Sequence, residues 1–143
     1  MKISRQFVLS LLVVFGALPL IAAEHTQDSL EKVRELVAAK KAVLIDVREK
    51  IEWDAGHIDG ARLVPMSKLK GKLTNEQLRE LLPADKIVYL YCAGGRRCLE
   101  VATMLENQKL QLRALKQGYQ TLLNDGFSKA LPEEVKPETT SVK

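Results

Sequence analysis

The chain alternates between two apolar patterns, and this alternation predicts its secondary structure. Short continuous runs rich in Val, Ile and Leu are typical of buried strands, whereas apolar residues three and four positions apart are typical of helices. The continuous runs predict strands over residues 42–47, 61–64, 86–91 and 110–115. The helical spacing predicts helices over residues 28–40, 49–55, 74–82, 98–105 and 119–124.

Residues that start and stop helices support these boundaries. Asp28 with Glu31, and Thr74 with Gln77, have the spacing of a capping box, in which each side chain binds the other residue's backbone N–H. Gly56 is placed to stop the second predicted helix, because glycine is common just after a helix end. Strands that alternate with helices predict an α/β fold, a parallel sheet with helices on both faces.

The size and composition fit a single domain of this class. The chain has 143 residues, of which 46% are hydrophobic and 28% charged, and this is enough for one modest core. We expect the domain to span residues 24–130. Residues 131–143 form a polar tail with two prolines and no apolar period, and this composition predicts disorder.

The first 23 residues differ from the rest of the chain. Lys2 and Arg5 precede an uncharged apolar run from Phe7 to Ala23, and a polar stretch follows at once. This is the layout of a secretory signal peptide, so we expect export, cleavage after Ala23 and no membrane contact afterwards. A retained membrane anchor is the alternative, because the run reaches the roughly 17 residues that a spanning helix needs.

The charge of the chain gives little evidence for a nucleic acid partner. The formal net charge is +4, but the predicted signal peptide holds two of the basic residues and no acidic ones. The other basic residues are scattered among acidic ones, with no aromatic platform or dense basic helix beside them. We therefore expect no nucleic acid binding.

The strongest chemical signal is the loop that follows the strand over residues 86–91. It begins at Cys92 and continues as Ala93-Gly94-Gly95-Arg96-Arg97. In a parallel sheet such a loop lies at the carboxyl ends of the strands, where ligands bind. Its small residues let successive backbone N–H groups turn inward, and the next helix adds partial positive charge. The loop is therefore predicted to bind an anion.

The same electrostatic field predicts a reactive Cys92. Inward N–H groups and the nearby Arg96 and Arg97 favour a thiolate, which is the nucleophilic form of cysteine, and no general base is then required. We expect Arg97 to be an anion ligand or a loop clamp, and Arg96 to be exposed and to steer the anion. The alternative is that Gly94 and Gly95 only form a turn.

Cys92 and Cys98 are the two cysteines of the chain. An even count in an exported protein predicts a structural disulfide by default, but the position of Cys92 in the loop favours a free, reactive thiol. Two interpretations of Cys98 stay open: a packed, inert residue, or a resolving thiol toward Cys92. His25 and His57 lack metal-ligand spacing with the cysteines, so we expect no metal and no cofactor.

Three blocks of the sequence resemble the rhodanese family. The loop from Cys92 to Arg97 after a hydrophobic strand resembles the rhodanese active-site loop. Leu44 to Arg48 looks like the family's early Asp-Val-Arg strand, and Glu52 to Ala61 is similar to its Glu-aromatic-x-x-Gly-His-Ile-x-Gly-Ala segment. The blocks follow the family order, and the resemblance covers residues 29 to 127. The exported single-domain format is similar to periplasmic, phage-shock-type rhodaneses, which implies a periplasmic location.

The resemblance implies a two-step sulfur transfer. Cys92 would take sulfane sulfur from a small anionic donor such as thiosulfate, form a persulfide, and pass the sulfur to cyanide or a thiol; a protein persulfide is an alternative partner. The loop residues 93–97 would bind the donor, and Asp46 and Arg48 would support the loop as structural charged groups. The six-residue loop has the length associated with sulfur substrates, whereas the related phosphatase and arsenate-reductase loops are one residue longer.

The chain departs from the family pattern at three places. Cys98 stands where Ser or Thr is common, Gln117-Gly118 replaces the usual Gly-Gly pair, and Leu122 replaces a customary Trp. The first departure leaves open a thiol redox protein that cycles Cys92 and Cys98, although their spacing is wider than in the usual redox motif. A non-catalytic rhodanese-like module that binds a partner is the third alternative.

Residues near the second block are expected to be structural. Trp53 is expected in the core. His57 and Gly56 are expected in a turn.

Overall fold

A computed structural model describes residues 23–131. The predicted signal peptide, apart from Ala23, and the predicted tail, apart from Leu131, lie outside the described residues. Within residues 23–131, every helix is too short or too polar to cross a membrane.

The sheet is parallel, as the alternation of strands and helices predicts. Its four strands lie in the order β2-β1-β3-β4. They are β1 (Ala42–Asp46), β2 (Arg62–Leu63), β3 (Ile87–Tyr91) and β4 (Gln111–Ala114). All four predicted strands are present, each shorter than the apolar run that predicts it, because the ends of those runs lie beyond the last paired residues.

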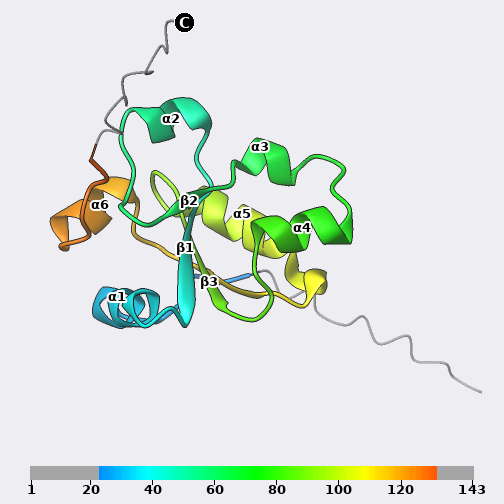
Figure 1. Cartoon of the computed structure of the whole chain (residues 1–143), viewed down its shortest axis with the longest axis horizontal. Helices are drawn as coiled ribbons and strands as arrows, with labels where there is room; N and C mark the ends of the chain where they lie inside the picture. Colours follow the sequence, from blue (N-terminus) through cyan, green and yellow to red (C-terminus); the bar gives the residue numbers. More distant parts are fainter. Residues whose placement is uncertain (1–22, 132–143) are drawn as a thin grey trace, which may run out of the picture.

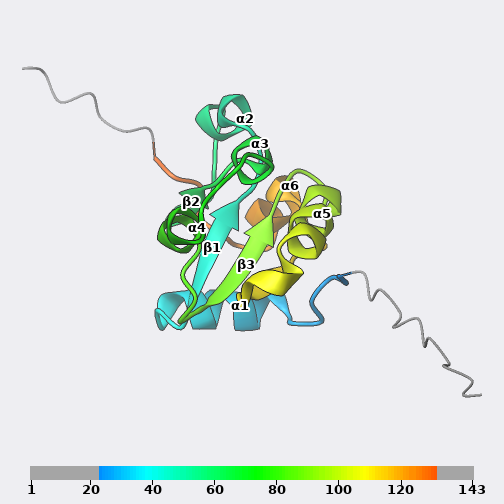
Figure 2. The ribbon, with the colours of Figure 1, turned by 90° about the vertical axis from the view of Figure 1, so that its right-hand side faces the viewer.

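Helices cover both faces of the sheet (Figure 1). One face carries α1 (Leu30–Ala38) and α6 (Tyr119–Asn124). The other carries α3 (Met66–Leu69), α4 (Asn75–Leu81) and α5 (Arg96–Met104). The short helix α2 (Lys50–Asp54) buries none of its residues and lies beyond the carboxyl ends of the strands (Figure 2).

Alternate residues of the central strands point to opposite faces, as the period of a strand requires. In β3, Tyr89 and Tyr91 belong to the core under α1 and α6, whereas Val88 and Leu90 belong to the core under α4 and α5. All four side chains are fully buried. The continuous apolar run of this strand therefore reflects burial on both sides of the sheet.

Two single-turn helices are absent from the sequence prediction. They are α3 and the 3₁₀ helix η1 (Glu106–Gln108). Elements this short have no room for an apolar period, so periodicity does not identify them.

The predicted capping box at Asp28 is wrong, whereas the one at Thr74 is confirmed. Ser29 caps α1 by accepting a hydrogen bond from the Lys32 N–H at 3.2 Å. Thr74 Oγ1 accepts from the Gln77 N–H at 3.3 Å, and the Gln77 side chain accepts from the Thr74 N–H at 2.9 Å.

The Asp28 carboxylate binds side chains of other segments and does not cap the helix. Its carboxylate accepts hydrogen bonds from Lys32 Nζ at 2.6 Å, from the Tyr89 hydroxyl at 2.7 Å and from Arg113 Nη1. These donors hold the pKa of Asp28 far below its usual range. The segment before α1 is thereby tied to β3 and β4.

The residues before Asp28 extend the sheet beyond β4. His25 forms an isolated parallel bridge with Ala114, and the Thr26 N–H donates to the Ala114 carbonyl at 2.8 Å. The polar sequence of this segment contains no strand pattern, so its pairing is visible only in the folded chain.

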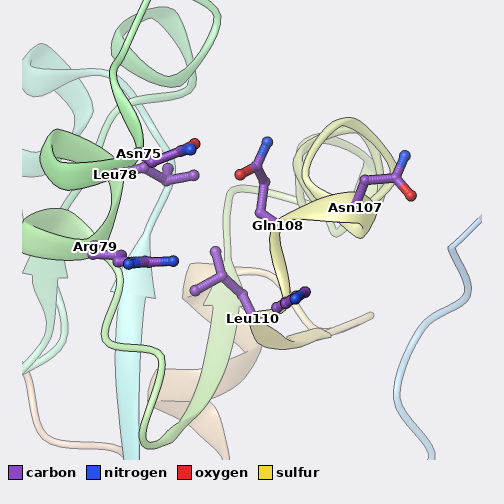
Figure 3. A pocket seen from close by; sticks show the side chains of 7 residues that line it. Asn75, Leu78, Arg79, Asn107, Gln108 and Leu110 are labelled. Carbon is purple, nitrogen blue, oxygen red and sulfur yellow. The ribbon is translucent and has the colours of Figure 1, made fainter.

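A pocket lies near the amino end of β4, and Figure 3 shows residues that line it. It opens between α4 and η1 near the start of β4, and its lining is mainly polar: Asn75, Leu78, Arg79, Asn107, Gln108, Lys109 and Leu110. Because Cys92 follows the far end of β3, this pocket is separated from it by the length of a strand.

At the carboxyl edge, two loops touch through their backbones. The Tyr119 N–H donates to the Cys92 carbonyl at 2.8 Å. A Cβ added to Gly118 would lie 1.7 Å from the Ala93 carbonyl oxygen, so no residue other than glycine fits there. The first glycine of the family's usual pair is Gln117 here, but the position where the backbones touch keeps its glycine.

We expect Gly118→Ala to lower the free energy of unfolding by about 3 kcal/mol, because the methyl group must push the two loops apart. Gly94→Ala is the matched control, since Gly94 has no neighbouring atom within 4 Å of an added Cβ. That variant should stay within about 0.5 kcal/mol of the wild type. Urea unfolding followed by circular dichroism measures both, and equal stabilities for the two variants would refute this account of the contact.

Candidate active site

Cys92 is the first residue after β3 and is 1% exposed. From β1 the chain crosses to β2 on one side, and from β3 it crosses to β4 on the other. Adjacent strands whose connections diverge in this way leave a crevice at their carboxyl ends, which is the usual ligand site of an open parallel sheet. The sequence-predicted position of Cys92 at this edge is therefore observed.

The loop after Cys92 wraps around the sulfur. The Gly95 N–H donates to Cys92 Sγ at 3.0 Å. Gly95 has φ +86°, and an added Cβ would lie 2.6 Å from the Lys116 carbonyl oxygen, so both its conformation and its packing require glycine. Ala93, Gly94 and Arg96 are exposed around the loop.

Hydrogen bonds to the sulfur lower the pKa of Cys92 to about 5. The largest contribution is the hydrogen bond from the Cys98 side chain; burial of the sulfur opposes it, and the N–H groups of Gly94, Cys98 and Gly95 add to it. A thiolate at neutral pH follows, because donors that point at the sulfur stabilise its charged form.

Cys98 serves here as a thiol donor. It is fully buried in the first turn of α5, and both cysteines are free thiols. The hydrogen bond to Cys92 and the burial of the side chain raise the pKa of Cys98 well above its usual range. Cys98 therefore stays protonated, and its thiol stabilises the Cys92 thiolate.

Arg97 lies in the site as a clamped group. Its Nη1 and Nη2 atoms donate to the two carboxylate oxygens of Glu52, each at 2.7 Å. This pair lowers the pKa of Glu52 to about 2. The hydrogen bonds to Glu52 raise the pKa of Arg97 above its usual range, and the charge of the Cys92 thiolate adds to this rise.

Glu52 is a functional-site residue that the sequence analysis does not identify. Its Oε2 also accepts from the Glu49 N–H at 3.0 Å, so α2 holds the carboxylate over the loop. Glu52 belongs to the second block of the family resemblance. Its position just past β1, at the same sheet edge as Cys92, is the signal that could have identified it.

Asp46 and Arg48, which the sequence analysis expects to support the loop, form a buried ion pair at the end of β1. Asp46 is fully buried, and its Oδ2 accepts from Arg48 Nη2 at 2.7 Å. The Arg48 guanidinium also donates to the Gly56 carbonyl at 2.8 Å and lies 4.2 Å from the centre of the Tyr119 ring. The pair thus links the end of β1 to the helix that holds the Cys92 carbonyl.

Trp53 is not a core residue, contrary to the prediction. It is half-buried on α2, and its ring stacks on that of His57 at 3.5 Å between centroids. His57 lies in the loop after α2, with Nδ1 3.1 Å from the Trp53 carbonyl oxygen. Trp53 therefore lies at the surface, where it lines a pocket together with Lys129, Ala130 and Leu131.

The described residues contain no group of three or more His, Cys, Asp and Glu side chains that could hold a metal ion. The groups that stabilise the Cys92 sulfur are backbone N–H donors and the Cys98 thiol. Such a set stabilises a thiolate and a bound anion.

Titration of the Cys92 thiolate tests this assignment. Its ultraviolet absorbance, corrected with Cys92→Ser, should rise with a midpoint near pH 5. Cys98→Ala should move the midpoint up by about one to two pH units because the largest donor is lost. Cys98→Ser keeps a donor and should stay close to the wild type. A wild-type midpoint above about pH 8, the range of a free cysteine, would contradict the assignment.

The geometry of the site agrees with the family of proteins to which the chain is similar. The model of the rhodanese-like domain matches residues 29–129. The uncharacterized protein YqhL of Bacillus subtilis is 42% identical over 81 residues, which cover 56% of this chain and 60% of YqhL. The probable adenylyltransferase/sulfurtransferase MoeZ of Mycobacterium tuberculosis is 41% identical over 83 residues, 55% of this chain and 20% of MoeZ.

Solved structures give the same result. The human single-domain sulfurtransferase TSTD1 is 27% identical with a TM-score of 0.56, covering 68% of this chain and 94% of that one. A thiosulfate sulfurtransferase from Pseudomonas aeruginosa is 25% identical with a TM-score of 0.61, covering 74% of this chain and 20% of that one. Together with the family match over residues 29–129, these similarities show that the chain belongs to the rhodanese-like domain family.

Proposed function

We propose that this protein is a sulfurtransferase that carries sulfane sulfur as a persulfide on Cys92. The observation that carries the proposal is the hydrogen bond of 3.0 Å from the Gly95 N–H to the Cys92 sulfur at the carboxyl edge of the sheet. The Cys98 thiol and the loop N–H groups lower the pKa of Cys92, which supports a thiolate at neutral pH. A thiolate at a preformed anion site can attack a sulfane sulfur without a general base. The named sulfurtransferases among the similar proteins support the same class of reaction.

The proposed reaction has two balanced steps. The Cys92 thiolate attacks the outer sulfur of thiosulfate, the S–S bond of the donor breaks, and sulfite leaves with the bonding electron pair. In the second step cyanide or a thiolate attacks the outer sulfur of the Cys92 persulfide. Thiocyanate or a new persulfide leaves, and the Cys92 thiolate is restored.

The charges around the loop indicate how the donor would be held. Glu52 compensates Arg97, so the net attraction for a dianion comes from the inward N–H groups, the amino end of α5 and the exposed Arg96. The clamped Arg97 fork would act at short range, where its remaining N–H groups can meet a sulfonate oxygen. The six-residue loop favours a sulfur donor over phosphate, as the family resemblance implies.

We also propose that the protein is located in the periplasm. The apolar run of residues 7–23 after Lys2 and Arg5 supports export to the periplasm by a cleaved signal peptide. This format is similar to that of periplasmic, phage-shock-type rhodaneses. The physiological acceptor would then be a small thiol of that compartment, and a protein persulfide is an alternative donor.

A thiol redox role is the second candidate, because the two free cysteines share a hydrogen bond. A disulfide would need Cys98 to react as a thiolate, and the raised pKa and full burial of Cys98 work against that. The redox role is therefore less favoured than sulfur transfer.

Intact mass spectrometry tests the proposal directly. After thiosulfate, we expect the protein to gain one sulfur atom that maps to Cys92, and cyanide should remove it as thiocyanate. The same mass locates the signal cleavage site in protein purified after export. Absence of the gain in reduced protein, or a Cys92 to Cys98 disulfide in its place, would reject the sulfurtransferase cycle in favour of a redox or binding role.

A matched pair of substitutions separates the two loop arginines. Arg97→Lys keeps the charge but loses the fork that binds Glu52, so we expect kcat/KM for thiosulfate to fall by about tenfold or more. Arg96→Lys keeps the charge of an exposed side chain and should change kcat/KM by no more than about twofold. Steady-state assays with thiosulfate and cyanide measure both, and equal losses would contradict the distinct roles.

A further inference from the structure

His25 lies against the active-site loop although it is far from that loop in sequence. Its Nε2 atom is 3.2 Å from the carbonyl oxygen of Gly95. A carbonyl oxygen only accepts hydrogen bonds, so Nε2 carries the proton and donates it. The family model matches residues 29–129. Gly95 lies inside this segment, whereas His25 precedes it.

Gly95 is the residue whose backbone completes the sulfur site. Its N–H donates to Cys92 Sγ at 3.0 Å, while its carbonyl accepts from His25 on the other side. Among residues 23–131, the only other hydrogen bond to this carbonyl comes from the Leu99 N–H, at a long 3.4 Å. A glycine in the left-handed region has more conformational freedom than any other residue, so an external contact is needed to keep its orientation.

The imidazole also covers Gly95. An added Cβ on Gly95 would lie 3.0 Å from His25 Nε2 and 2.6 Å from the Lys116 carbonyl oxygen. Gly95 is therefore enclosed between the His25 ring and the loop before α6. Because Gly95 is buried, little water reaches its peptide groups to replace a lost hydrogen bond.

We propose that His25 is a positioning residue of the active-site loop, which holds Gly95 by its carbonyl so that the Gly95 N–H stays directed at the Cys92 sulfur. This inference rests on the proposed function in one respect, that the sulfur so positioned is the one that accepts and releases sulfane sulfur. His25 acts through Gly95 and does not touch the reacting atom.

The segment that carries His25 is held in place by other contacts. The Thr26 N–H binds the Ala114 carbonyl at 2.8 Å, and Asp28 binds Tyr89 and Arg113. Removal of the imidazole should therefore leave the segment paired with β4. Substitutions of His25 then report on the hydrogen bond to Gly95 and not on loss of the whole segment.

Three substitutions at His25 isolate the hydrogen bond. In His25→Gln the amide nitrogen is as many bonds from Cβ as Nε2 of histidine, so its N–H can reach the Gly95 carbonyl. In His25→Asn the amide nitrogen is one bond closer to Cβ, so its N–H cannot reach that carbonyl. His25→Leu removes the donor and keeps bulk. Gln111→Leu, at an exposed position of β4, is the control for an added apolar side chain.

The experiment uses the full chain and three measurements: the titration midpoint of the Cys92 thiolate, the rate of persulfide formation with thiosulfate, and the urea midpoint of unfolding. In His25→Leu and His25→Asn we expect the thiolate midpoint to rise by roughly half a pH unit, and the rate to fall by about threefold to tenfold, the range of one hydrogen bond. His25→Gln should restore both values, and Gln111→Leu should change neither.

Two results would overturn the proposal: His25→Leu with an unchanged midpoint and rate, or His25→Gln as impaired as His25→Leu. Failure of the proposed function has a different signature. If the wild type forms no persulfide while the thiolate midpoint still rises in His25→Leu and recovers in His25→Gln, the positioning role stands and sulfur transfer fails. If persulfide forms at the same rate in all variants with equal midpoints, sulfur transfer stands and the positioning role fails.

Discussion

The active site depends on the contact between two backbones at the carboxyl edge of the sheet. The loop after β3 and the loop before α6 touch where the Cys92 carbonyl accepts the Tyr119 N–H and where Ala93 meets Gly118. This contact orients the peptides of the Cys92 loop, and their N–H groups then point at the sulfur. Without it, the small residues of the loop would have too much conformational freedom to hold an anion cradle.

Two arginines at this edge of the sheet are each paired with a carboxylate, whereas the Cys92 sulfur has no ion-pair partner among the described residues. Arg48 is paired with Asp46 below the loop, and Arg97 is paired with Glu52 beside it. The thiolate is consequently stabilised mainly by short-range hydrogen bonds, from the Cys98 thiol and from backbone N–H groups, and less by the net charge of the site. Such donors act on the sulfur whether or not salt screens the surface. A site of this kind suits chemistry in which negative charge moves between a sulfur atom and a leaving anion.

Local patterns in the sequence predicted the elements well and their tertiary partners poorly. The Thr74 capping box is present because both partners lie within one turn, whereas Asp28 leaves its predicted role because Tyr89 and Arg113 offer stronger contacts. Trp53 is hydrophobic enough for a core but lies on a helix that buries none of its residues, so it stacks on His57 instead. The Asp28 difference arises from partners distant along the chain, whereas the Trp53 difference arises because α2 does not pack its residues into the core.

The sequence by itself determined the α/β class, the order of strands and helices, and the position of Cys92 at the start of a small-residue loop, because these follow from periodicity and from neighbours along the chain. It also identified the three blocks that the family match supports. Only the tertiary structure decided that Glu52 clamps Arg97, that Cys98 donates to the Cys92 thiolate, and that His25 reaches Gly95. The physical reason is that these contacts depend on the register of the sheet and the docking of its loops, which place distant residues within hydrogen-bond distance.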